Sequence, residues 1–87
     1  MDKEFIIKTV NQALAEEFEL APEQLKPEAS FREDLHLDSL DSVDMIIALE
    51  QAFDFKLTDR SQIKHVKILR DVYDFIEKQH LDGYISG

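Results

Sequence analysis

A short polar segment around Ser39 holds the residues whose types and spacing could do chemistry. Ser39 stands between Asp38 and Leu40-Asp41, directly ahead of a stretch with helical apolar periodicity. A serine in the first turn of a helix exposes its hydroxyl, and the helix N-terminus favours an attached phosphate through its free N–H groups and its dipole. Taken alone, however, the same pattern favours a plain helix cap, with Asp38 as the N-cap and Asp41 as its partner.

The other candidates for catalysis or metal binding are weaker. His36 lies close to Ser39 and suggests a Ser–His nucleophile, but no third group is evident that would orient such a pair. The acid-rich residues 34–50 lack the loop glycine and ordered oxygen ligands of an EF-hand. His36, His65 and His80 are too scattered for a pair of helical metal ligands, so we expect no metal site. The absence of cysteine excludes a cysteine nucleophile, and any thiol must come from outside the chain.

Length and charge limit the classes of protein to which the chain can belong. With 87 residues it is one domain, and its hydrophobic fraction of 44% suits a folded globule. The net charge of −9 makes nucleic acid and anionic lipid surfaces poor partners. No apolar run is long enough to span a membrane, and the start Met1-Asp2-Lys3-Glu4 lacks the features of a signal peptide. We therefore expect a cytoplasmic protein.

The charge is distributed unevenly along the chain. Residues 31–55 carry seven acidic side chains and one basic side chain, a net charge of −6. Residues 56–70 carry one acidic and five basic side chains, a net charge of +4. The acidic block is the obvious docking surface, and the basic block after it differs in character from the rest of the chain.

Hydrophobic periodicity predicts helices and no strands. Only two glycines and two prolines occur, and no alternating apolar stretch is flanked by turn residues. The first helix is predicted over residues 5–18, and its inward stripe consists of Ile7, Val10, Leu14 and Phe18. A loop bracketed by Pro22 and Pro27 follows, and the side chains expected to pin it to the core are Leu20, Leu25 and Phe31.

The second helix is predicted to begin at Asp38 or Ser39, and its wide apolar face consists of Leu40, Val43, Ile46, Ile47, Leu49 and Phe53. A short third helix is expected over residues 60–66. A fourth runs from about Ile68 to Gln79, ends before Gly83, and turns inward the side chains of Leu69, Val72, Phe75 and Ile76. The predicted fold is all-α, a small four-helix bundle of three longer helices and one short third helix. We expect a single domain over residues 1–82 and a C-terminal tail over residues 83–87.

Several segments together resemble the acyl carrier protein family. They are residues 29–35, 38–44, 48–50, 53–54 and 74–76, and the resemblance extends from residue 5 to about residue 79. It implies that Ser39 bears a 4′-phosphopantetheine arm, which comes from coenzyme A and is attached through a phosphodiester. The arm's terminal thiol would carry acyl groups as thioesters, which agrees with a chain that has no cysteine. By this resemblance Ser39 is an attachment point, and the protein is not an enzyme.

The resemblance also implies partners and a surface that meets them. Acyl carriers shuttle intermediates between the enzymes of fatty acid or related lipid or polyketide biosynthesis. The expected partners are a phosphopantetheinyl transferase and synthase, reductase, dehydratase and acyltransferase enzymes, and the carrier itself is expected to be a monomer. Basic patches on these enzymes would read the second helix, on which the assigned contact residues are Asp38, Leu40, Asp41, Asp44, Ile47 and Glu50. Leu40 is the preferred apolar contact, whereas Glu50 fits a plain solvated position equally well.

An acyl chain could be sheltered where flexible aliphatic side chains of the bundle meet. The residues assigned to this pocket are Val43, Ile46, Leu49, Val66 and Leu69. Each methylene that enters such a pocket contributes about 0.8 kcal/mol. Leu40, Val43 and Ile47 could serve either the core or a partner.

Some positions depart from the family pattern. The family usually has glycine where His36 stands, so the turn before the serine is expected to differ in shape, and it often has proline where Thr58 stands. Its short third helix is normally acid-rich, whereas Arg60, Lys64 and Lys67 dominate here. These departures favour a specialised carrier over a housekeeping one. The alternatives are a peptidyl or D-alanyl carrier, which shares the attachment serine, and an unmodified helical protein-interaction domain.

Overall fold

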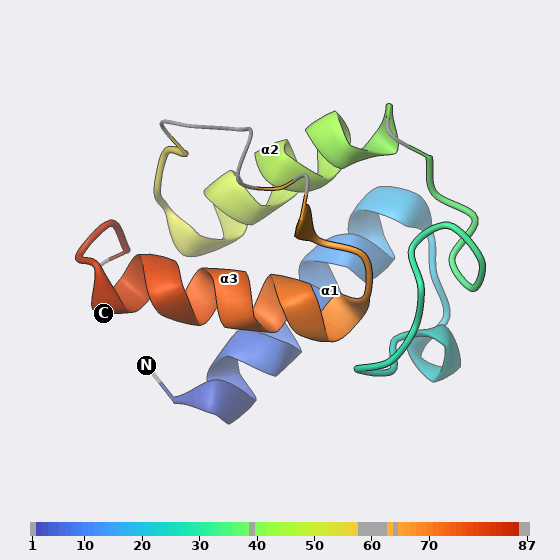
Figure 1. Cartoon of the computed structure of the whole chain (residues 1–87), viewed down its shortest axis with the longest axis horizontal. Coiled ribbons are helices and arrows are strands. Elements are labelled where there is room, and N and C mark those ends of the chain that lie inside the picture. The colour runs from blue at the N-terminus through green and yellow to red at the C-terminus, as the bar shows by residue number, and fades with distance from the viewer. Residues whose placement is uncertain (1, 39, 58–62, 64, 86–87) are drawn as a thin grey trace.

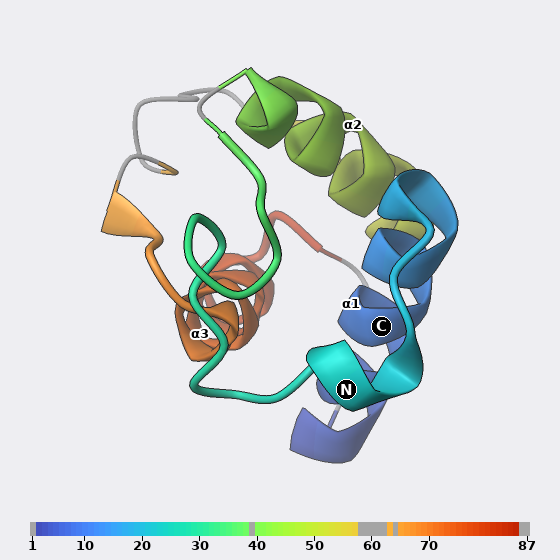
Figure 2. The ribbon, with the colours of Figure 1, turned by 90° about the vertical axis from the view of Figure 1, so that its right-hand side faces the viewer.

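The computed structural model describes residues 2–38, 40–57, 63 and 65–85, and these residues form the predicted all-helical bundle. The elements are α1 (Lys3–Phe18), the 3₁₀ helix η1 (Pro22–Gln24), α2 (Asp41–Phe53) and α3 (Leu69–Leu81). Helix α1 packs against both α2 and α3. In Figure 2 α3 is seen nearly end-on, with α1 beside it and α2 above (Figures 1 and 2). No helix among the described residues is both long and apolar enough to cross a membrane.

Helix α1 begins at Lys3, two residues before the predicted start at Phe5. The Asp2 carboxylate caps it by accepting a hydrogen bond of 2.9 Å from the Phe5 N–H. The inward stripe is rotated by about one residue from the prediction: Ile6 is buried, whereas Ile7 and Phe18 are only half-buried, and Val10 and Leu14 complete the buried stripe. Ile6, Val10 and Leu14 recur every four residues, so they lie on one face of the helix.

Helix α3 follows the predicted span closely but buries a different aromatic residue. Tyr73 is 1% exposed, whereas Phe75, which we expected to point inward, is half-buried. The Tyr73 hydroxyl donates a hydrogen bond to Asn11 Oδ1 of α1, which satisfies the polar end of a buried ring. Burial raises the pKa of the Tyr73 phenol above its ordinary value, so the group remains a neutral donor at physiological pH.

The short third helix that we predicted over residues 60–66 lies outside the described residues, except for Ile63, His65 and Val66. Thr58, Arg60 and Lys64, three of the positions that depart from the family pattern, also lie outside them. Ile63 is buried in the core and Val66 packs against the core, so both residues extend the hydrophobic cluster.

The predicted C-terminal tail contributes to the core. Helix α3 is followed by its C-cap Asp82 and then by Gly83, which has a φ of +87° and therefore sits where glycine is favoured. Around it the Tyr84 N–H bonds Gln79 O at 2.9 Å and the Gly83 N–H bonds His80 O at 3.1 Å, the pattern of a Schellman cap. This turn directs Ile85 back to the bundle, where it is 3% exposed.

We predict that Ile85→Ala lowers the free energy of unfolding by about 2–4 kcal/mol, because it removes a buried side chain and leaves a cavity. Urea denaturation would measure the change. Leu81→Ala is the matched control, since Leu81 lies nearby at 76% exposure and its loss should change stability by less than about 0.5 kcal/mol. Equal effects of the two substitutions would contradict a packed C-terminus.

Candidate functional site

The turn that leads into α2 is held by two aspartates that bond each other's backbone. Asp38 Oδ1 accepts hydrogen bonds from the Leu40 N–H at 2.9 Å and the Asp41 N–H at 3.2 Å. In return, Asp41 Oδ2 accepts one from the Asp38 N–H at 3.0 Å. The predicted capping pair of Asp38 and Asp41 is therefore confirmed. Regular helix begins only at Asp41, later than predicted, and its N-cap residue is Leu40.

Ser39, the predicted attachment residue, lies outside the described residues, but both of its neighbours in sequence are described. Asp38 is exposed, and the Leu40 side chain is 78% exposed. The first N–H groups of α2 follow directly, and such a helix start favours a phosphate. Both sequence neighbours of position 39 therefore face solvent, next to a helix start that is suited to a phosphate-linked group.

His36 adopts a backbone conformation that glycine takes most easily. Its φ is +57°, in the left-handed region, where a non-glycine residue is strained by about 1 kcal/mol. The next residue, Leu37, donates its N–H to Phe31 O at 2.7 Å, which closes the loop over residues 31–37. The substitution of the family's usual glycine by histidine thus leaves the turn in a glycine-type conformation.

An exposed face of α2 combines apolar and acidic side chains. Leu40, Val43 and Ile47 are 78%, 45% and 41% exposed, and Asp44 is exposed beside them. Val43, which we assigned to the acyl pocket and also considered for partner contact, is exposed together with the predicted partner contacts Leu40, Asp44 and Ile47. The reason is that Met45, Ile46 and Leu49 already occupy the inward face of this helix.

Glu50 differs from the other residues assigned to partner contact. Its Oε2 accepts a hydrogen bond of 2.7 Å from the Leu57 N–H, and its side chain is half-buried. The carboxylate therefore holds the segment that follows α2 against the helix. The sequence offered no signal for this bond, because it joins groups separated by a turn whose shape is not encoded in any short motif.

A pocket of about 540 Å³ opens next to Asp38. Its lining comes from the loop before α2, the start of α2 and the segment before α3, and consists of Ser30, Phe31, Arg32, Glu33, Leu37, Asp38, Asp41, Ser42, Met45, Ile63, Val66 and Lys67. Of the residues we assigned to an acyl pocket, Val66 lines it directly. Ile46, Leu49 and Leu69 are buried in the core and do not line it.

The sequence reasoning missed most of the pocket's apolar lining. Phe31 was expected to pin the loop to the core, and it does pack against the core, half-buried, while it also forms part of the pocket wall. Leu37, Met45 and Ile63 carry no sequence signal for such a role, because the pocket exists only where three separate segments meet.

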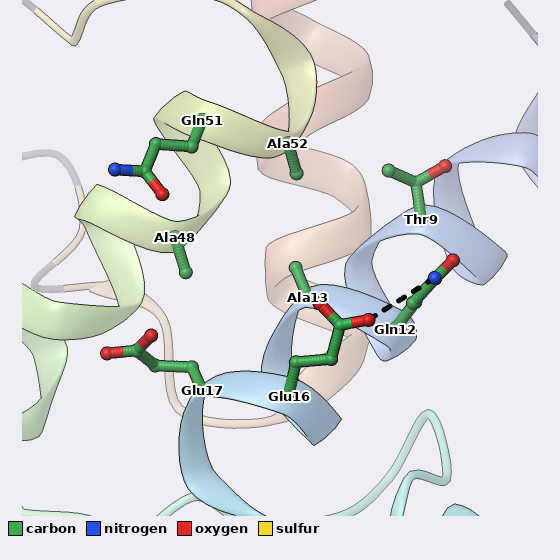
Figure 3. A pocket seen from close by; sticks show the side chains of 8 residues that line it. All are labelled: Thr9, Gln12, Ala13, Glu16, Glu17, Ala48, Gln51 and Ala52. Carbon is green, nitrogen blue, oxygen red and sulfur yellow. Dashed lines mark hydrogen bonds between the residues drawn. The ribbon is translucent and has the colours of Figure 1, made fainter.

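A second hollow lies between α1 and α2, toward the C-terminal half of α2. It has a volume of about 410 Å³, and Figure 3 shows its lining residues, Thr9, Gln12, Ala13, Glu16, Glu17, Ala48, Gln51 and Ala52. The three alanines leave room between the helices, and the Gln12 amide donates a hydrogen bond of 3.4 Å to Glu16 Oε1 at its edge. It holds none of the residues that flank position 39. Among the described residues no group of His, Cys, Asp or Glu is arranged to bind a metal ion.

Comparison with known proteins identifies the class of protein that this fold and site define. The family model described as "Phosphopantetheine attachment site" matches residues 8–76. The chain is 42% identical over 79 residues to an acyl carrier protein of Thermosynechococcus vestitus, which covers 91% of this chain and 96% of the relative. It is 36% identical over 76 residues to an acyl carrier protein of Rubrobacter xylanophilus, covering 87% and 93% of the two chains.

The chain therefore belongs to the acyl carrier protein family. Its prosthetic group is 4′-phosphopantetheine, covalently attached, and the protein is a carrier and not an enzyme. The structure fits this group. Asp38 and Leu40, the two sequence neighbours of position 39, are exposed just before α2, and Asp38 also lines the pocket.

We predict that His36→Gly raises the free energy of unfolding by up to about 1 kcal/mol, because it relieves left-handed strain that outweighs the greater freedom of glycine in the unfolded chain. His36→Val should lower it, since a β-branched residue is poorly tolerated at this φ. Urea denaturation of the three proteins would measure both changes. Destabilisation by His36→Gly would mean that contacts of the imidazole outweigh the strain.

Proposed function

We propose that this protein carries acyl intermediates as thioesters on an arm attached to Ser39, and passes them between enzymes of fatty acid or related lipid or polyketide biosynthesis in the cytoplasm. The observation that carries the proposal is the sequence Asp38-Ser39-Leu40 at the exposed start of α2, inside the region that matches the phosphopantetheine attachment family. The arm supplies the thiol that the chain lacks, since no cysteine occurs in the sequence.

The residues around Ser39 would position the arm and would not react. Asp38 Oδ1 accepts hydrogen bonds from two backbone N–H groups, so this side chain shapes the turn before α2. The imidazole of His36 sits on a turn residue with a left-handed backbone and has no hydrogen bond to a carboxylate within the described residues. Both facts support an attachment site served by a separate phosphopantetheinyl transferase.

The exposed face of α2 supports docking of such enzymes. Leu40, Val43 and Ile47 present an apolar line, and Asp44 adds negative charge without a hydrogen bond or ion pair in the described part of the chain. Apolar contacts of this kind provide affinity, while charge complementarity raises the rate of encounter. We infer that synthase, reductase, dehydratase and acyltransferase partners bind this face through basic patches.

Incubation with coenzyme A and a broad-specificity transferase tests the attachment. Intact-mass analysis should show one added arm on the parent protein, and peptide mapping should place it on Ser39. Ser39→Ala should abolish the addition, whereas Ser42→Ala, a matched change at the next serine in the sequence, should leave it intact. An arm on the Ser39→Ala variant would overturn the assignment, and an unmodified parent would favour a plain interaction domain.

Charge reversal on α2 tests the docking face. Asp44→Lys should reduce kcat/KM for loading by the transferase several-fold at low salt, and added salt should shrink the difference. Asp44 is preferred over Asp41, whose carboxylate caps the helix, so the substitution leaves the fold unchanged. Glu23→Lys on η1 is the control with the same change of charge. Equal slowing by both variants would point to a general effect of net charge and not to docking on α2.

A further inference from the structure

Two positively charged side chains share the lining of the pocket beside Asp38. They are Arg32 and Lys67, and both are exposed. Neither side chain forms an ion pair or hydrogen bond anywhere in the described part of the chain, although the sequence carries 19 acidic residues. A pocket with two unpaired cations at its edge is a site where an anion can be held.

The backbone brings the two cations together. Ser30 and Ile68 form an isolated antiparallel bridge, and the Phe31 N–H donates a hydrogen bond of 3.1 Å to Lys67 O. The Lys67 N–H is itself fixed by Asp71 Oδ2 at 3.0 Å. Arg32 follows Phe31 directly, so both cations extend from segments that are tied to each other, although 35 positions separate them in the sequence.

Two of the three acidic residues of the pocket are engaged in the turn before α2. Asp38 and Asp41 each direct one carboxylate oxygen to backbone N–H groups of that turn, at the N-terminal end of α2. The partial positive charge of that helix end offsets part of their negative charge. Glu33 is the third acid of the lining, and its side chain is exposed.

The rest of the lining consists of five apolar side chains, those of Phe31, Leu37, Met45, Ile63 and Val66, and of Ser30 and Ser42. A pocket that combines an apolar lining with cations at its edge suits a ligand with an apolar part and an anionic group. An arm attached at position 39 would begin next to Asp38, at this edge, and it has a phosphodiester at its start and an acyl group at its far end.

We propose that Arg32 and Lys67 form an anion subsite that holds an anionic oxygen group of the tethered arm at the edge of this pocket. The group is the phosphodiester of the arm or a carboxylate on its acyl cargo. The subsite rests on the proposed attachment at Ser39. In this subsite Lys67 has a role within the carrier: the subsite directs the arm toward the pocket. It also favours acyl cargo that carries an anionic group.

The test compares the parent protein with the double variant Arg32→Gln/Lys67→Gln. Lys8→Gln/Lys78→Gln is the control, since it removes the same charge from exposed residues outside the pocket. Each protein is prepared in four forms, apo, holo, butyryl-holo and succinyl-holo, with the arm verified by intact mass. Thermal unfolding at low and high salt and the ³¹P chemical shift of the phosphodiester are the measurements.

At low salt, at least one of the three arm-bearing forms of the parent and the control should melt about 4–8 °C above the apo form, and the double variant should lose this gain. A gain already present in the holo form, with a shifted ³¹P signal, identifies the phosphodiester as the anion. A gain that appears with succinyl but not with butyryl identifies the carboxylate. Indistinguishable behaviour of the double variant and the control in all four forms would overturn the subsite. Failure of the parent to acquire the arm on Ser39 would instead contradict the proposed attachment.

Discussion

The long segment between α1 and α2 depends on its backbone pairing with the residues that precede α3. Among the described residues of the segment 19–40 the only helix is the short η1, and a segment of this length with so little regular structure is uncommon in a small domain unless it serves a function. Three hydrogen bonds hold it: Phe31 N–H to Lys67 O, Leu69 N–H to Ala29 O, and Arg70 N–H to Pro27 O, at 3.1, 3.0 and 2.7 Å. Without this pairing the loop would lose its shape, and the turn before α2 would lose its support.

The pairing also explains how a small bundle can hold both a core and a pocket. It buries Leu25, Ala29 and Leu35 of the loop, at 9%, 6% and 3% exposure, so the loop supplies part of the core. Phe31 remains half-buried at the pocket wall. A chain of 87 residues has limited apolar area to bury, so contributions from a loop and from Ile85 at the C-terminus matter to its stability.

Near α2, some side chains hold the fold through hydrogen bonds and others face solvent. The carboxylates of Asp38 and Asp41 are used inside the turn, and that of Glu50 holds the segment after the helix. Leu40, Val43 and Asp44 are left toward solvent. Acidic residues of one short segment therefore have different roles. Composition alone cannot distinguish the carboxylates that hydrogen-bond within the fold from those that remain exposed to solvent.

The sequence by itself determined the features that depend on neighbours along the chain. Helical periodicity predicted the three α-helices, and the reciprocal bonds of Asp38 and Asp41 followed from their spacing, because capping joins groups only three residues apart. The motif around Ser39 and its flanks identified the family. Length, charge and the absence of cysteine pointed to a single acidic domain whose thiol comes from elsewhere.

Only the tertiary structure decided features that depend on which distant surfaces meet. Helical periodicity does not say which edge of a wide apolar face stays exposed, so it left open whether Val43 serves the core or the surface, and in the structure this side chain is 45% exposed. The burial of Tyr73 depends on Asn11 of another helix, and that of Ile85 on a turn that folds the chain back. Arg32 and Lys67 line the same pocket for a similar reason. The bridge between Ser30 and Ile68 joins their two segments, and no local sequence pattern relates those segments.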